Sequence, residues 1–350
     1  MINKIKSLII KFFIDKRLIK KNIVKWYTSR KNEKRTFKPG ILNEDKKFYV
    51  INRDRGGLFS VFFYVLDHLK YAEKKGYIPV VDIENFSSFN SEAEPVNGTK
   101  NTWLYYFTQV SKFKLSEVYK SKTFFFSTNN DILDENGRNK YFQKETDFTA
   151  YYQILNKYFE IQPNIYDLAN EFYLSEIKGY KVLGIHWRGS DYYYSPGHAF
   201  PATKNQIINL IDFYIKEENY EKIFVVTEDK KKLEILKKRY GNKISFYNSF
   251  RTDDPNDFLI PKRPLHKFKL GLESLIEVII FSKLNKIVGI NSNIVNAAIV
   301  LSNNKTKFVQ IKNGWNSQKF FWSSYKWYFL NLLPSFLGGF DDFKNLKNRK

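Results

Sequence analysis

The stretch GIHWRGSDYYYSPGH, residues 184–198, holds three side chains that could do chemistry together. His186, Arg188 and Asp191 stand at or just after the end of an apolar run of strand type, KVLGIHW. An arginine offers a planar set of donors that can hold a pyrophosphate at two points and stabilise charge on a departing phosphate. This stretch therefore predicts an anion-binding catalytic site at the end of a buried strand.

Two further polar clusters follow predicted strands in the second half of the chain. Glu228 and Asp229 follow KIFVVT, and Ser292 and Asn293 follow KIVGIN. Ligands of open parallel sheets bind beyond the carboxyl ends of the strands, so we expect the clusters to converge. The first amides of the helix after Ser292 could hold an anion. Ser292 could equally be a plain helix cap, and the paired acids could be a cap and a first-turn acid.

Three other residues are candidates for the same ligand. Glu277 stands on an otherwise apolar predicted helix, 272–284, where its carboxylate could accept two hydrogen bonds from the edge of a guanine. Gly56 and Gly57 follow the first predicted strand and could lie near the ligand, although a tight turn also explains them.

The sequence disfavours phosphate loops and metal centres. It contains no G-x-x-x-x-G-K-[ST] segment, no cysteine and only four scattered histidines. The two acids of TDD, residues 252–254, stand in a proline-containing loop rather than beside a strand. A metal-free site built on arginine is therefore favoured, and no cofactor is expected.

The elements that would position these residues alternate between strand and helix. This alternation predicts an α/β fold with parallel sheets and helices on both faces. We predict two Rossmann-like parallel-sheet domains that face a cleft. An arginine, a helix start and an acid that could read guanine suit a nucleoside-diphosphate sugar as the ligand. The predicted divisions are therefore a basic amphipathic arm at 1–38, an acceptor-side domain at 39–175, a nucleotide-sugar-binding domain at 176–312 and an aromatic segment at 313–350.

The 350-residue chain has a formal net charge of +22. A coding bias toward lysine accounts for part of this charge, but the first 40 residues are especially basic. They suggest either an amphipathic helix on an anionic membrane or a solvated first helix. No apolar stretch reaches the roughly 20 residues of a membrane span. Lys11 and Asp15 also interrupt any signal-peptide core. We expect a cytoplasmic protein, peripheral on the inner face of the membrane.

Several of these segments resemble the fucosyltransferase superfamily that includes alpha-1,6-fucosyltransferases, nodulation fucosyltransferases and protein O-fucosyltransferases. GIHWRGSDY resembles the His-x-Arg-x-x-Asp motif of that superfamily. FVVTED, SLIEVIIFSKLNKIVGINSNIVNAA and the glycine-containing DRGGLFSVFFYVLDHLKYAEKKGYIPVVD are similar to its other conserved segments. The resemblance covers roughly residues 50–85 and 180–300.

The resemblance implies a GT-B-like fold, a GDP-sugar donor, no metal, and inversion at the anomeric carbon. It places Arg188 and Ser292 on the donor phosphates, His186 facing the nucleotide, Glu228 and Asp229 near the ribose or base, and Glu277 on guanine. The chain departs from the pattern in three places: Gly189 replaces a second arginine, Asn293 replaces a second serine, and YYYSPGHAFPAT is an unusual sequel to the motif.

We therefore expect an inverting, metal-independent glycosyltransferase that transfers a sugar, most simply fucose from GDP-fucose. Its acceptor would be a hydroxyl of a glycan or lipid-linked glycan in surface polysaccharide biosynthesis. Asp54, Asp191 and Glu228 are candidate general bases. The alternatives are another inverting nucleotide-sugar transferase, a basic nucleic-acid binder, and a membrane-bound scaffold without catalysis. No nucleic-acid motif is present, which disfavours the second of these.

Overall fold

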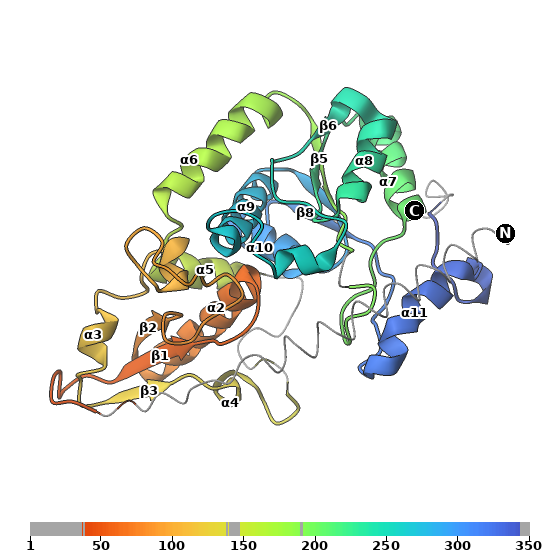
Figure 1. Ribbon diagram of the computed structural model, residues 1–350. Coiled ribbons are helices and arrows are strands. Elements are labelled where there is room, and N and C mark those ends of the chain that lie inside the picture. Colours follow the sequence, from red (N-terminus) through yellow and green to blue (C-terminus); the bar gives the residue numbers. More distant parts are fainter. Residues whose placement is uncertain (1–36, 38, 138, 140–147, 190–191, 344–350) are drawn as a thin grey trace.

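The computed structural model describes residues 37, 39–137, 139, 148–189 and 192–343 (Figure 1). Its strands form two sheets, one of three strands in the order β2-β1-β3 and one of five in the order β6-β5-β4-β7-β8. All neighbouring strands in both sheets run parallel. The predicted α/β class with two parallel sheets is confirmed.

The first half of the chain builds the three-stranded sheet. Its central strand is fully buried apart from its last residue, which explains the unbroken apolar run in the sequence. The long helix that follows ends at Gly76, whose left-handed backbone lets its amide close the last turn. The elements are β1 (Phe48–Asn52), α2 (Leu58–Lys75), β2 (Ile78–Asp82), η1 (Thr102–Tyr105), α3 (Leu115–Val118), β3 (Phe124–Phe126), α4 (Asn129–Ile132), α5 (Thr149–Tyr158), α6 (Pro163–Phe172) and η2 (Tyr173–Ile177).

The second half builds the five-stranded sheet from strands that alternate with helices, as predicted. Its elements are β4 (Val182–His186), α7 (Lys204–Glu218), β5 (Lys222–Val226), α8 (Lys230–Tyr240), η3 (Gly241–Lys243), β6 (Ile244–Ser245), η4 (Pro255–Phe258), α9 (His266–Ser282), β7 (Lys286–Gly289), α10 (Asn293–Leu301), β8 (Lys307–Gln310), α11 (Phe320–Leu332) and η5 (Ser335–Leu337).

Helix α9 begins six residues earlier than the predicted 272–284. Gly271, the residue just before the predicted start, lies inside the helix. A Cβ at this position would lie 2.3 Å from the hydroxyl oxygen of Tyr106, which donates a hydrogen bond to the carbonyl of Phe268 at 2.9 Å. The glycine is thus explained by the close approach of the first half of the chain.

The two halves share one hydrophobic core. Helices α9 and α10 lie between the second sheet and the helices of the first half, where α9 contacts α6 and α10 contacts α2 and α5 (Figure 1). Buried side chains from both halves belong to this core, among them Phe62, Phe107, Ile276 and Val295. In this region the two halves of the chain therefore meet through helices and not through strands.

Helix α11 packs on the second half, beside the tyrosine-rich segment that follows the His-x-Arg motif. The hydroxyl of Ser323 donates to the carbonyl of Tyr194 at 2.8 Å, and the Trp327 ring meets Tyr193 edge-on, with centroids 4.4 Å apart. The tyrosines are therefore supported by the C-terminal helix. Within the described ranges, no helix is long and apolar enough to cross a membrane. The predicted basic arm, apart from Phe37, lies outside the described residues.

Candidate active site

The three predicted clusters meet at the carboxyl end of the second sheet. Strand β4 lies between β5 and β7, so the residues that follow these strands are neighbours. His186, the last residue of β4, has its Nδ1 3.3 Å from the hydroxyl oxygen of Ser292. Arg188 has its Nε 3.6 Å from Oε1 of Glu228, which follows β5. The convergence expected from the strand ends is present.

His186 is a neutral, buried imidazole. Its exposed fraction is 1%, and burial is the largest cause that lowers its pKa to about 3, with further lowering from Arg188 and Lys232. Its Nε2 is buried and has no hydrogen-bond partner among the described residues. This side chain can therefore offer a ligand a hydrogen bond without a charge.

The neutral state of His186 in the folded chain predicts that stability depends on pH. The unfolded chain binds a proton at His186 below about pH 6.5 and the folded chain does not, so acid favours unfolding. We expect proton binding at His186 in the unfolded chain to lower the free energy of unfolding by about 1.5 kcal/mol between pH 6.5 and pH 5. Urea denaturation should show a flatter pH profile for His186→Gln and an unchanged profile for His198→Gln, which alters an exposed histidine. Equal profiles for wild type and His186→Gln would contradict the buried neutral state.

Glu228 is an ionised carboxylate that holds the turn after the motif. Its Oε1 accepts a hydrogen bond from the Gly189 amide at 3.0 Å. Burial raises the pKa of Glu228, but the charges of Arg188 and Lys232 outweigh burial and hold it well below its usual range. A carboxylate held in this way is a weak proton acceptor, so Glu228 is poorly suited to be the general base.

Of the other two candidate bases, only Asp54 lies within the described residues. Asp54 belongs to the first half and has a carboxylate oxygen 3.6 Å from Nε of Arg55. Asp191 lies outside the described residues.

Two predicted ligand residues act as helix caps. The carboxylate of Asp229 accepts from the Lys232 amide at 3.1 Å at the start of α8, and Ser292 accepts from the Val295 amide at 3.4 Å at the start of α10. Ser292 also reaches His186, so its capping role and its place in the cluster coexist. Asn293 is the exposed first residue of α10.

Gly56 and Gly57 lie in the first half, immediately before α2. Gly56 has φ +92°, and Gly57 caps the helix without a side chain. The cluster in the second half is assembled without them, and their contact with a ligand stays a prediction.

Glu277 is buried beside an arginine that the sequence analysis did not single out. Its Oε1 accepts from Nη2 of Arg251 at 3.2 Å and from the hydroxyl of Ser249 at 2.7 Å. The loop that carries Arg251 runs along the end of β5, where the Thr252 amide donates to the carbonyl of Glu228 at 3.1 Å. An acid buried on an apolar helix requires a partner. In the sequence, this requirement could have pointed to a basic partner such as Arg251.

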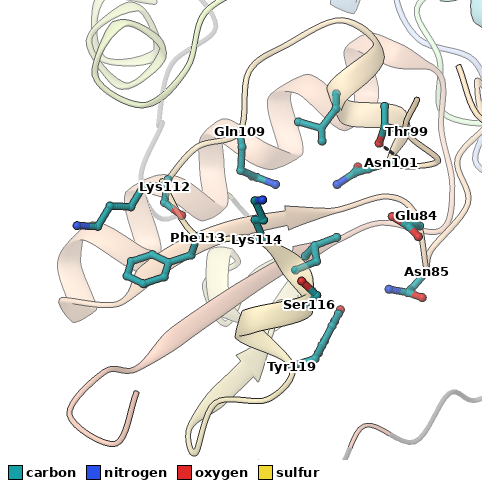
Figure 2. Close-up of a pocket in the computed structure, with 13 residues that line it drawn as sticks. Glu84, Asn85, Thr99, Asn101, Gln109, Lys112, Phe113, Lys114, Ser116 and Tyr119 are labelled. Atoms are coloured by element: carbon teal, nitrogen blue, oxygen red, sulfur yellow. Dashed lines mark hydrogen bonds between the residues drawn. The ribbon is translucent and has the colours of Figure 1, made fainter. Parts of the chain in front are cut away.

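A cavity of about 480 Å³ lies away from this cluster, beside the edge strand β2 (Figure 2). Two amides in its lining are engaged with that strand: Gln109 bonds both the amide and the carbonyl of Val81, and Asn101 accepts from the Ile83 amide. They satisfy the outer edge of the sheet. No predicted site residue lines this cavity.

The described part of the chain contains no group of three or more histidine and acidic residues placed to hold a metal ion.

This arrangement defines an α/β protein with two parallel sheets and an arginine at the strand ends of the second. No family model and no curated protein matches the chain. The chain is similar to solved fucosyltransferases. Fucosyltransferase NodZ from Bradyrhizobium is 13% identical, covers 77% of this chain and 96% of its own, and has a TM-score of 0.48. POFUT1 in complex with GDP is 10% identical, covers 76% and 99%, and has a TM-score of 0.46. Both are fucosyltransferases by name, as are the proteins that the sequence resembles.

Proposed function

We propose that this chain is a glycosyltransferase that uses a GDP-sugar, most simply GDP-fucose. The observation that supports this proposal is the junction of β4, β5 and β7, which brings together a guanidinium, a neutral imidazole and the start of α10. The guanidinium and the helix start both attract anions, and the imidazole adds a hydrogen bond without charge. A nucleoside diphosphate suits such a set of groups.

The reaction is an inverting substitution at the sugar. An acceptor hydroxyl attacks the anomeric carbon while the bond from that carbon to the diphosphate oxygen breaks, so the products are a glycoside and GDP. The hydroxyl proton passes to a base or to water. Arg188 stabilises the negative charge that develops on the leaving diphosphate. The proposed acceptor is a free or lipid-linked surface glycan precursor.

We assign binding of the nucleoside to the acidic residues around this junction. In the proposal Glu228 and Asp229 face the ribose or base, and Glu277 reads guanine while its Oε1 stays bonded to Arg251. The first half, with Gly56 and Gly57, would approach the donor from the other side.

A thermal-shift panel tests the proposal with GDP, UDP, CMP, dTDP and a short oligonucleotide. A ligand present at about 100 times its Kd adds roughly 2.7 kcal/mol to the free energy of unfolding. Stabilisation by GDP supports the proposal, and stabilisation by UDP or dTDP would keep the reaction class with a different donor. No response to any nucleotide would overturn it, and a response to the oligonucleotide alone would favour a nucleic-acid binder.

We also propose that the chain lies on the cytoplasmic face of an anionic membrane, with α11 as a contact. Trp322 and Phe329 on this helix are 60% and 62% exposed, and Lys326 is exposed between them at helical spacing. Phe336 and Leu337 extend the apolar surface beyond the helix, at 83% and 60% exposed. Aromatic rings interleaved with lysine suit a membrane interface.

Replacing Trp322 and Phe329 with serine should weaken binding to phosphatidylserine vesicles at least about tenfold, because burying each ring contributes about 1.5–3 kcal/mol. Vesicle cosedimentation measures this change. Leu174→Ser removes an apolar side chain that is 57% exposed on the first half and should leave binding unchanged. Equal binding by the double variant and wild type, or no binding by wild type, would refute the contact.

A further inference from the structure

Lys232 is a buried lysine beside the candidate active site. It is 5% exposed, whereas the side chain of Lys231, its neighbour on α8, is 75% exposed. Lysine is almost never buried to this extent unless other groups pair with it. The contacts around its ammonium therefore indicate what holds it in place.

The ammonium lies against the backbone of the His-x-Arg motif. Nζ donates to the carbonyl of Arg188 at 3.1 Å and lies 4.0 Å from a carboxylate oxygen of Asp229. The rings of Trp187 and Tyr193 face it at 5.4 and 5.1 Å. Cation–π attraction and a charged hydrogen bond thus hold the ammonium at this place.

The position of the ammonium accounts for Gly189. A Cβ added at Gly189 would lie 1.4 Å from Nζ of Lys232. The lysine therefore occupies the space where a side chain at residue 189 would begin. This is also the residue at which the chain departs from the motif that it resembles, since a second arginine is replaced by glycine.

Lys232 acts electrostatically on the same groups as Arg188. The charges of both residues lower the pKa of Glu228, and both lower the pKa of His186. The two cations thus approach the same carboxylate and imidazole from different elements, Arg188 from the end of β4 and Lys232 from the first turn of α8.

We propose that Lys232 is the second cation of the diphosphate site, holding Arg188 in position and adding positive charge where residue 189 has no side chain. This inference rests on the proposed function, because it takes a nucleoside diphosphate as the ligand. Lys232 is a positioning residue whose effect falls on the phosphates and not on the nucleoside.

Calorimetric titration with GDP and with guanosine tests this role. In Lys232→Met the apolar stem is kept and the charge is lost, so we expect about 10- to 100-fold weaker GDP binding and less than threefold change for guanosine. Lys231→Met removes the neighbouring exposed charge and should change neither affinity. A loss of GDP and guanosine affinity by the same factor would indicate a merely structural lysine and would overturn the proposal.

Gly189→Ala also perturbs the Lys232 ammonium, because the added methyl group displaces it while the lysine itself is unchanged. We expect a similar loss of GDP affinity in the wild-type background and no further loss in Lys232→Met, so the two substitutions should be non-additive. Additive effects, or GDP binding by Lys232→Met equal to wild type, would overturn the proposal. Absence of GDP binding by wild type would instead reject the proposed function itself. Gly189→Ala also keeps the test available if Lys232→Met fails to fold.

Discussion

Arg188→Ala should lose sugar transfer by about 100- to 1,000-fold and should lose the stabilisation by GDP, because it removes the group that we propose stabilises the charge on the leaving diphosphate. The guanidinium is positioned for this role by the end of β4 and by Glu228, whose carboxylate lies 3.6 Å from its Nε. Single-turnover rates and the GDP thermal shift measure the two losses. Arg188→Lys should fall between wild type and alanine, since lysine keeps the charge without the planar pair of donors.

The matched control is Arg239→Ala. Arg239 pairs with Asp212 at 2.6 Å on the surface, with both side chains more than 40% exposed, and such pairs contribute about 0–1 kcal/mol. This variant should transfer sugar at the wild-type rate. Transfer by Arg188→Ala at a rate close to that of Arg239→Ala would rule out the role of Arg188.

Glu277→Ala should lower the free energy of unfolding by about 3–5 kcal/mol, because it leaves the guanidinium of Arg251 buried without its carboxylate. Both side chains of this ion pair are only 7% exposed. Burial raises the pKa of Glu277 to about 7, although Arg251 and the bond from Ser249 act against that rise. Urea denaturation at pH 8, where the carboxylate is ionised, measures the loss.

Two comparisons separate this structural role from the proposed reading of guanine. Glu234→Ala breaks an exposed pair with Lys237 and should change the free energy of unfolding by less than about 1 kcal/mol. Glu277→Leu combined with Arg251→Met should recover much of the stability, because neither charge is then left alone. If Glu277→Ala kept wild-type stability and lost only GDP affinity, the ion pair with Arg251 would not contribute to the free energy of unfolding.

The local pattern of the sequence was sufficient to place most strands and helices. Apolar runs such as KVLGIHW and KIFVV are typical of buried strands, and their alternation with helices implies parallel sheets. One difference is the start of α9, which was predicted at residue 272, just after Gly271, and lies at His266. The reason for that glycine lies about 165 residues away in the chain, at Tyr106, and no local pattern contains it.

The residues of the site also divide into those that the sequence pattern could predict and those that it could not. The meeting of His186, Arg188, Glu228 and Ser292 could be predicted from sequence, because side chains at the ends of adjacent parallel strands must lie near one another. Lys232 and Arg251 could not. In the sequence Lys232 is one of three consecutive lysines, and only the packing of Trp187 and Tyr193 around it separates it from exposed Lys231. Periodicity determines which residues share an element, whereas burial of a charge depends on contacts between distant segments, which only the tertiary structure decides.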